Sequence, residues 1–218
     1  MLDELGIAVE LDGPQVAACV SQVGIAFAFA RMFHPAMRHA ATVRAELGIP
    51  TVFNMLGPIA HPARLKRAVI GVSDPSRLEL LADVMRRRGV DRVWLVHGQD
   101  GLDELSTSAP SQIVDVSADR VERRTLHASE VGITEVSGDE IGGGDPVDNA
   151  RIITEVLAGK PGPDADLILL NAAAGLVVSG LHDDLGEALE AARTSIASGA
   201  AERTLTDLRK VTAELVAP

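Results

Sequence analysis

The stretch VWLVHGQDGLDELS, residues 93–106, decides the fold of this chain. Its first four residues are apolar without a break, which is typical of a strand buried on both faces of a sheet. Two glycines then end the strand and begin a loop in which Asp103 and Glu104 stand side by side. Ligands in open α/β sheets bind at the carboxyl ends of strands, and carboxylate oxygens are ligands that Mg²⁺ prefers. The stretch therefore predicts either a magnesium site on a bent loop or a solvated acidic turn.

The pattern around this strand predicts alternating strands and helices. An apolar run at 68–72 indicates a strand, and residues 75–88 form a helical pattern with Leu78, Leu81 and Met85 on one face. Strand, helix and strand at this spacing indicate a βαβ unit with parallel pairing. Further strands are expected at 92–96, at 25–30 and as short pieces within 112–137, and further helices over 14–23, 35–47, 148–157, 167–179, 185–198 and 201–215. The predicted fold class is α/β, a parallel-rich central sheet flanked by helices, in a single catalytic-type domain of residues 1–218.

Composition excludes several classes of protein. The 218 residues carry a formal net charge of −11, which argues against general nucleic-acid binding because that requires a basic surface. No signal peptide and no apolar run long enough to cross a bilayer is visible in the sequence, so membrane association is not expected. The single cysteine, Cys19, rules out an internal disulfide and suits a reducing cytoplasm. Cys19 lies in an apolar helical pattern and is expected to be a buried structural thiol.

Arg44 is the polar exception on an otherwise apolar helix face. In the predicted helix over 35–47, Met37, Arg44 and Leu47 share that face. A planar guanidinium suits bidentate capture of a carboxylate, although an ion pair at the edge of the face is an equally simple interpretation. His34 precedes the helix and is expected to cap it and to meet water at its first turn. Gly57 reads as a tight turn that also lets backbone approach a ligand.

The glycine run at 142–144 leads into a predicted helix. Such a run could be a phosphate loop, because helix N-termini bind anions. Asp145 followed by Pro146 favours another interpretation, in which Asp145 caps the helix and Pro146 occupies its first position.

Several blocks of the sequence together resemble the anthranilate phosphoribosyltransferase family. They are FAFARMFHPAMR at 27–38, VRAELG at 43–48 with FNMLGP at 53–58, DGLDELS at 100–106, GGDPVDNA at 143–150, and LLNAA at 169–173. The resemblance extends from about Leu5 to the end of the chain, and blocks in the family's order and approximate spacing make it specific. It implies the fold of the nucleoside-phosphorylase-like transferases and the transfer of a phosphoribosyl group from phosphoribosyl pyrophosphate to anthranilate, the second step of tryptophan biosynthesis from chorismate.

The resemblance also implies roles for particular residues. Asp103 and Glu104 would hold Mg²⁺ against the pyrophosphate, and Arg44 would bind the anthranilate carboxylate. His34, Gly57 and Met37 would line the anthranilate pocket. No catalytic acid or base is assigned, because positioning is expected to do most of the work in this reaction. The family forms homodimers through a small helical domain, against which residues of about 31–50 would pack.

The sequence departs from the family's pattern in two respects. Arg31 stands where the family usually has Pro, and Met37 where it often has Tyr, and both bear on the choice of acceptor. The family's Gly-Thr-Gly-Gly-Asp and Lys-His-Gly-Asn runs are absent. A truncated gene product, a wrongly placed start at Met1 and a split enzyme that needs a separate N-terminal half remain open. The alternative function is therefore a non-catalytic fragment or one partner of a split enzyme. A relative that binds nucleic acid is disfavoured by the acidic charge.

Overall fold

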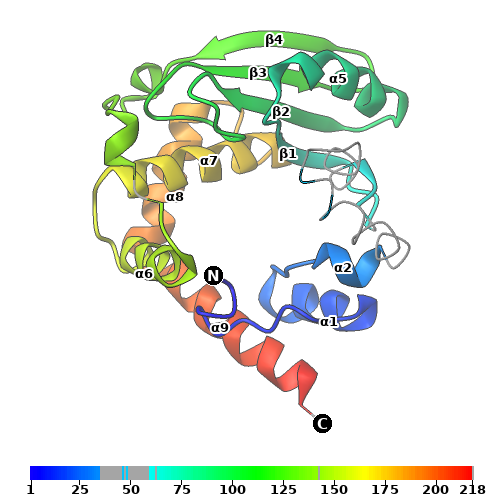
Figure 1. Ribbon diagram of the computed structural model, residues 1–218, viewed down its shortest axis with the longest axis vertical. Coiled ribbons are helices and arrows are strands. Elements are labelled where there is room, and N and C mark those ends of the chain that lie inside the picture. The colour runs from blue at the N-terminus through cyan, green and yellow to red at the C-terminus, as the bar shows by residue number, and fades with distance from the viewer. Residues whose placement is uncertain (35–45, 47, 49–58, 62, 142, 218) are drawn as a thin grey trace. The chain divides into compact units, whose positions relative to one another are not determined.

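The structure is a computed structural model that describes residues 1–34, 46, 48, 59–61, 63–141 and 143–217. The chain divides into two compact units (Figure 1). One, which we call the sheet unit, consists of residues 63–143 and 158–198. The other, the helical unit, consists of residues 1–62, 144–157 and 199–218. The expectation that both act as a single catalytic domain stays a prediction.

The sheet unit is built on a mixed sheet. Its described strands are β1 (Arg67–Gly71), β2 (Arg92–Gly98), β3 (Ser111–Val116) and β4 (Val121–Leu126), in the spatial order β1-β2-β3-β4. β1 and β2 are parallel, whereas β2 with β3 and β3 with β4 are antiparallel. The α/β class is confirmed, and the sheet is mixed rather than parallel-rich. Only residues 117–120 separate β3 from β4, and parallel neighbours require a crossover of a dozen or more residues.

Helices cover both faces of this sheet, as Figure 1 shows. The short 3-10 turn Pro75–Arg77 and α5 (Leu78–Arg87) connect β1 to β2, which confirms the predicted βαβ unit. The predicted apolar face of α5 is buried, with Leu78, Leu81, Ala82 and Met85 between 2 and 6% exposed. On the other face, α7 (Pro163–Ser179) and α8 (Leu185–Ala197) pack with Trp94, Val96 and Ile113 in one core cluster. Short 3-10 turns lie at Ala128–Val131 and Gly138–Glu140.

The helical unit contains α1 (Gly13–Val23), α2 (Ala30–Phe33), α6 (Pro146–Leu157) and α9 (Ala200–Val216) among its described residues. Its core cluster joins segments distant in sequence, namely Leu5, Ile7, Cys19, Ala150 and Leu208. Cys19 is fully buried, as expected, and its Sγ donates to the Ile25 carbonyl at 3.3 Å. Burial raises the pKa of this thiol, which favours a structural role over nucleophilic chemistry.

The predicted strand at 25–30 is wrong. Residues 24–29, all of them described, form no strand, and α2 begins at Ala30. Ile25 and Phe27 are 48% and 40% exposed, and Phe27 stacks against Phe29 with ring centroids 6.1 Å apart. A short apolar run becomes a strand only where a neighbouring strand accepts its hydrogen bonds, and periodicity alone does not show this.

The remaining helix predictions for 14–23, 148–157, 167–179, 185–198 and 201–215 are confirmed within a few residues at their ends. The predicted helix over 35–47 lies almost entirely outside the described residues. Within the part of the chain that the structure describes, no helix has the length and apolarity needed to cross a membrane.

Candidate functional site

The acidic loop lies where the sequence placed it, at the carboxyl end of the parallel pair. β1 and β2 pair from Arg67 with Arg92 to Gly71 with Val96, and the Val72 N–H extends the pairing by donating to the Val96 carbonyl at 2.9 Å. The chain then leaves β2 into residues 99–110. Backbone hydrogen bonds from Gly98 to Leu102 (2.8 Å) and from Gln99 to Pro110 (2.9 Å) fold these residues into a compact loop.

Two glycines allow this loop to lie against the strand ends. A Cβ atom on Gly71 would collide with the backbone carbonyl of Asp103. A Cβ atom on Gly98 would lie 2.5 Å from Asp100 Oδ1 and 3.1 Å from Ser106 Cβ. Because other atoms of the loop occupy the space that a side chain would need, both positions require glycine. The backbone of Asp103 is thus held directly against the end of β1.

Asp100 organises the inside of the loop. Its Oδ2 accepts hydrogen bonds from the hydroxyls of Ser106 and Ser108, and its Oδ1 accepts from the Leu102 N–H at 3.3 Å. Burial by itself would raise the pKa of Asp100, but the hydrogen bonds from Ser106, Ser108 and Leu102 outweigh it and lower the pKa. This carboxylate is therefore an ionised anchor of the loop, with its oxygens already occupied by donors.

Asn171 on α7 fixes the other end of the acidic pair. Its Oδ1 accepts from the Leu105 N–H and its Nδ2 donates to the Leu105 carbonyl, both at 2.9 Å. Leu105 is fully buried, and the next residue, Ser106, donates its N–H to Ser111 Oγ at 2.8 Å. Backbone groups that leave water need such partners. These bonds hold the backbone directly after Glu104 in place.

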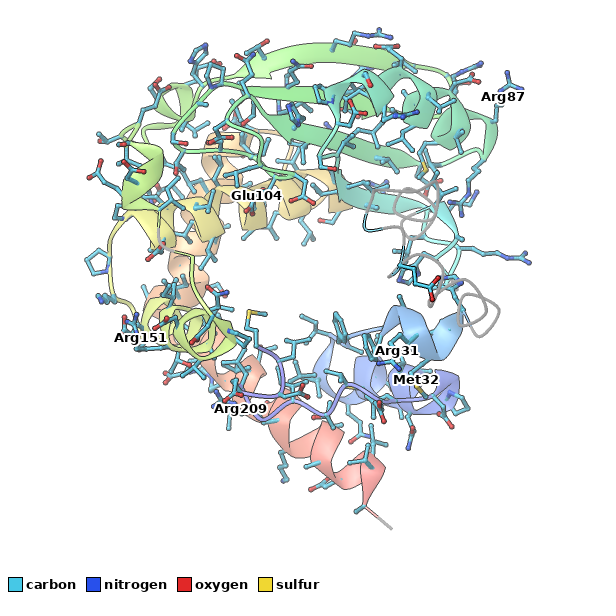
Figure 2. The ribbon with its side chains drawn as sticks, viewed as in Figure 1. Arg31, Met32, Arg87, Glu104, Arg151 and Arg209 are labelled. Carbon is cyan, nitrogen blue, oxygen red and sulfur yellow. The ribbon has the colours of Figure 1, made fainter. Side chains whose placement is uncertain are left out.

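Asp103 and Glu104 lie next to each other at a bend in the backbone of this loop. The bend removes the alternation by which adjacent side chains of a strand point to opposite faces. Asp103 is exposed and Glu104 is partly buried; Figure 2 labels Glu104 on the loop. Burial raises the pKa of Glu104, and the negative charges of Asp103 and Asp100 raise it further. Asp100, Asp103 and Glu104 thus give this loop a high negative charge, which a bound cation could offset.

The donor set fits Mg²⁺ shared with a phosphorylated ligand. Among the described residues no group of three metal-binding side chains converges, so the loop supplies a carboxylate pair rather than a complete cage. Mg²⁺ is usually held by one or two carboxylates together with substrate phosphates and waters. Asp103 and Glu104 are the residues that could provide those carboxylates.

The predicted anthranilate residues are placed only in part. His34 follows α2 in the helical unit, where its N–H donates to the Ala30 carbonyl at 3.0 Å. It lies close enough to His61 to affect that residue, whose pKa is lowered first by burial and then by the His34 charge. Arg44, Met37 and Gly57 lie outside the described residues. Arg31, one of the departures from the family pattern, places its guanidinium 5.9 Å from the Phe29 ring centroid.

Asp145, directly after Gly144, caps α6. Asp145 Oδ1 accepts from the N–H groups of Val147 and Asp148 at 2.8 and 2.9 Å. The Gly144 N–H donates to Asn149 Oδ1 at 3.1 Å, and Asn149 Nδ2 returns a bond to the Gly144 carbonyl. The N-cap interpretation is confirmed, and these amides are occupied rather than presented to an anion.

Sequence reasoning missed the residues that position the loop. Asn171 interrupts an apolar helical pattern, and that interruption was the available signal. Gly71 lies within the strand predicted at 68–72, with nothing local to indicate its contact with Asp103. His97, at the end of β2, is 6% exposed, and its Nδ1 lies 2.8 Å from the Val72 carbonyl, so this nitrogen carries the proton and ties β2 to the segment after β1.

Comparison with known proteins places the chain in a family. Residues 1–202 match the family model described as "Glycosyl transferase family, a/b domain". The chain is 46% identical over 204 residues to an anthranilate phosphoribosyltransferase of Thermomicrobium roseum, covering 92% of this chain and 59% of that protein. It is 43% identical over 221 residues to the one of Rhodococcus jostii, covering 99% and 61%.

Solved structures of anthranilate phosphoribosyltransferases have the same fold as this chain. Anthranilate phosphoribosyltransferase from Thermus thermophilus superposes with a TM-score of 0.89 at 37% identity, over 97% of this chain and 63% of that one. The Saccharomyces cerevisiae enzyme in complex with phosphoribosyl pyrophosphate and Mg gives 0.89 at 28% identity, over 98% and 62%. The chain spans about three-fifths of the length of these relatives. By the match over most of its length, the chain belongs to the glycosyl transferase family, a/b domain.

Proposed function

We propose that this chain takes part in transferring the phosphoribosyl group from phosphoribosyl pyrophosphate to anthranilate, giving phosphoribosyl-anthranilate and pyrophosphate on the route to tryptophan. The observation that carries the proposal is the loop at the end of β2, where the Asp103 backbone meets Gly71 and Asn171 fixes Leu105. A pair of carboxylates held this rigidly suits a reaction in which positioning does most of the work.

Asp103 and Glu104 are the proposed Mg²⁺ residues. When bound there, Mg²⁺ would offset the negative charge that develops on a departing pyrophosphate. The role of the loop is to hold the two carboxylates, while the occupied carboxylate of Asp100 keeps the loop closed. The complex of the yeast relative with phosphoribosyl pyrophosphate and Mg supports a role for Mg²⁺ together with this substrate.

Arg44, His34, Met37 and Gly57 are the proposed anthranilate residues. A guanidinium suits a carboxylate because it donates two parallel hydrogen bonds. A yeast relative solved in complex with 4-fluoroanthranilate supports an aromatic acid as the acceptor. A homodimer and a cytoplasmic location belong to the same proposal.

The test follows the loss of anthranilate fluorescence on mixing the purified chain with phosphoribosyl pyrophosphate and MgCl₂. The double variant Asp103→Asn with Glu104→Gln is expected to abolish turnover. Asp139→Asn with Glu140→Gln is the matched control, because it removes the same charge from a 3-10 turn of the same unit. Turnover that survives equally in both variants contradicts the assignment of the metal pair.

Calorimetry with phosphoribosyl pyrophosphate, in the presence and absence of Mg²⁺, separates binding from chemistry. A folded chain that binds the ligand with Mg²⁺ but does not turn it over favours the alternative, in which the chain is one partner of a split enzyme. A folded chain that neither binds nor turns over favours a non-catalytic fragment.

A further inference from the structure

The sheet unit has a cavity whose lining contains none of the residues proposed to bind Mg²⁺ or anthranilate. It has a volume of about 520 Å³, and none of its lining residues comes from the loop of residues 99–110. Strands β2, β3 and β4, the 3-10 turn Ala128–Val131, the C-terminal end of α7, the residues just before α8 and its first residue line it. We call it the Trp94 pocket, after the large aromatic side chain in its lining.

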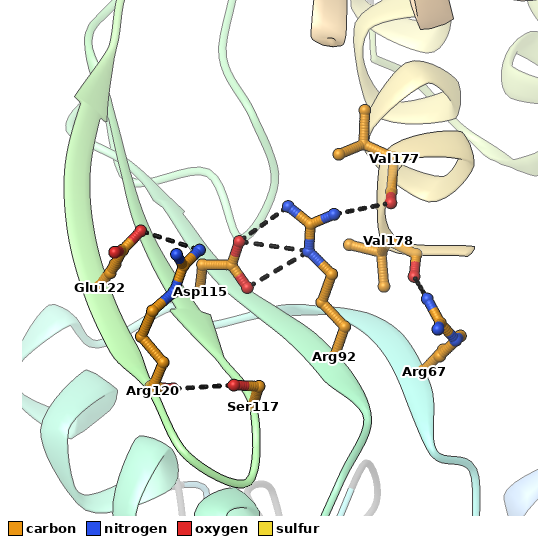
Figure 3. Close-up of polar contacts among 8 residues, drawn as sticks. All are labelled: Arg67, Arg92, Asp115, Ser117, Arg120, Glu122, Val177 and Val178. Carbon is orange, nitrogen blue, oxygen red and sulfur yellow. Dashed lines mark hydrogen bonds and ion pairs between the residues drawn. The ribbon is translucent and has the colours of Figure 1, made fainter. Parts of the chain in front are cut away.

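Trp94 lies within reach of two guanidinium groups. The Arg92 and Arg124 guanidinium carbons are 5.5 and 4.7 Å from its ring, and the side chain is 1% exposed. Arg92 is fully engaged, since it donates to both oxygens of Asp115 and to the Val177 carbonyl at 3.1 Å (Figure 3). It joins the strands to the end of α7 and is structural.

Arg124 contacts the same ring without such partners. Arg124 is exposed, and in the described portion of the chain its side chain has no hydrogen bond or ion pair, whereas its neighbours in the lining are paired, Arg120 with Glu122 at 3.0 Å and Arg123 with Glu79. Burial lowers the pKa of Arg124 and Arg92 lowers it further, while the negative charges of Asp115, Glu130 and Asp184 act in the opposite direction. The stacked guanidinium therefore retains its N–H donors for an acceptor in the pocket.

Asp183 in the lining also has no side-chain partner in the part of the chain that the structure describes, in contrast to two other acidic residues there. Asp184 caps α8 by accepting from the Glu187 N–H at 3.0 Å, and Glu130 accepts from the His127 N–H at 2.8 Å. Asp183 is exposed, and within the described residues its side chain forms no hydrogen bond or ion pair. An unpaired cation and an unpaired anion thus line one pocket without pairing with each other.

We propose that the Trp94 pocket binds a small zwitterion, an α-amino acid, with its carboxylate on Arg124 and its ammonium group facing Asp183. A simple anion would engage Arg124 but would also meet the five carboxylates that accompany four arginines in the described lining. A zwitterion satisfies both unpaired groups and adds no net charge. Its aliphatic part can rest on the apolar lining of Leu126, Val131 and Leu185.

The intrinsic fluorescence of the chain reports on this pocket, because Trp94 is its single tryptophan and the chain has no tyrosine. Tryptophan emission of the full chain is recorded during titration with L-leucine, and calorimetry provides an independent affinity. Isocaproate, which lacks the ammonium group, and isoamylamine, which lacks the carboxylate, are the matched ligands, and inorganic phosphate is the simple anion. Saturable binding of leucine is expected, with each matched ligand at least about tenfold weaker because a charge-assisted contact is lost.

Substitutions of the lining residues test whether leucine binds in the Trp94 pocket. Arg124→Gln is expected to weaken leucine binding about tenfold or more, and Asp183→Asn is expected to reduce the preference for leucine over isocaproate. Arg87→Gln, which removes an arginine paired with Asp83 on α5, leaves the affinity unchanged. Circular dichroism confirms folding of each variant. The proposal is overturned if leucine does not bind, if Arg124→Gln binds it as the parent does, or if isocaproate or phosphate binds as tightly.

Discussion

Asn171 and Leu105, 66 residues apart in the sequence, form a reciprocal pair of hydrogen bonds in which a side-chain amide takes the place of a strand partner. Both bonds are 2.9 Å long, one from the Leu105 N–H and one to its carbonyl. Leu105 directly follows Glu104, so these two hydrogen bonds join helix α7 to the part of the loop that carries Asp103 and Glu104. Positioning of the proposed metal residues therefore depends on a helix from a later part of the chain.

Asn171→Ala is expected to destabilise the chain by about 2–4 kcal/mol, because it leaves the N–H and carbonyl of buried Leu105 without partners. Asn171→Asp keeps the acceptor, but it sets a carboxylate oxygen against the Leu105 carbonyl and adds negative charge near Asp103 and Glu104, so it should also destabilise the chain. Urea denaturation followed by circular dichroism measures both. Ser179→Ala, at the exposed end of the same helix, serves as the control. A loss below about 0.5 kcal/mol for Asn171→Ala would show that the pair does not hold the loop.

Gly71→Ala is expected to displace the loop, because the new Cβ would collide with the Asp103 carbonyl. We expect a loss of about 2 kcal/mol or more in stability, with weaker Mg²⁺-dependent binding of phosphoribosyl pyrophosphate. Gly175→Ala is the matched control, since a Cβ atom there would meet no neighbouring segment within 4 Å and alanine favours a helix interior by up to about 1 kcal/mol. Equal stability of the two variants would contradict the close approach.

Glu104 makes stability depend on pH. Its pKa is raised in the folded chain by burial and by Asp103 and Asp100, so the folded state binds more protons than the unfolded state between the ordinary value of 4.5 and the raised value. This contribution to stability is present below pH 4.5 and is lost as the pH rises through the folded pKa. Denaturation at a series of pH values should show a shallower decline for Glu104→Gln and, because one neighbouring charge is removed, for Asp103→Asn. An unchanged decline in Glu104→Gln would exclude this residue as its source.

Arg92→Met is expected to cost about 3 kcal/mol, because it leaves the partly buried carboxylate of Asp115 without its cation. Asp115 has a side chain only 15% exposed, and Arg92 also donates to the Val177 carbonyl. Arg87→Met breaks an exposed ion pair with Asp83 on α5 and should cost less than about 1 kcal/mol. Thermal or urea unfolding of both variants tests the difference, and similar costs would refute the structural role given to Arg92.

Arg44→Gln tests the anthranilate assignment. If Arg44 binds the carboxylate, the variant should weaken anthranilate binding about tenfold or more while leaving phosphoribosyl pyrophosphate binding unchanged. Anthranilate fluorescence in an equilibrium titration reports the first quantity, and calorimetry reports the second. Arg151→Gln on α6, where Arg151 is paired with Glu155, controls for loss of charge. Equal loss of both ligands would point to misfolding rather than a specific contact.

The amino-acid sequence by itself determined the local elements of this protein. Helix α5, the βαβ unit, the loop after β2 and the cap at Asp145 were all predicted, because hydrophobic periodicity and backbone sterics act between residues close in sequence. The same reasoning failed for residues 25–30 and for the direction of β3 and β4. Strand pairing depends on which neighbour is available, and an apolar run does not carry that information.

Only the tertiary structure decided how the acidic loop is held and where charges remain unpaired. The contacts of Gly71 with Asp103 and of Asn171 with Leu105 join segments that no short-range pattern connects. Arg124 reads in the sequence as one of two adjacent arginines on a charged strand, yet its partner is the Trp94 ring while Arg123 pairs with Glu79. Whether a polar group finds a partner depends on what the fold brings within about 3 Å of it, and this distance is set by packing rather than by sequence spacing.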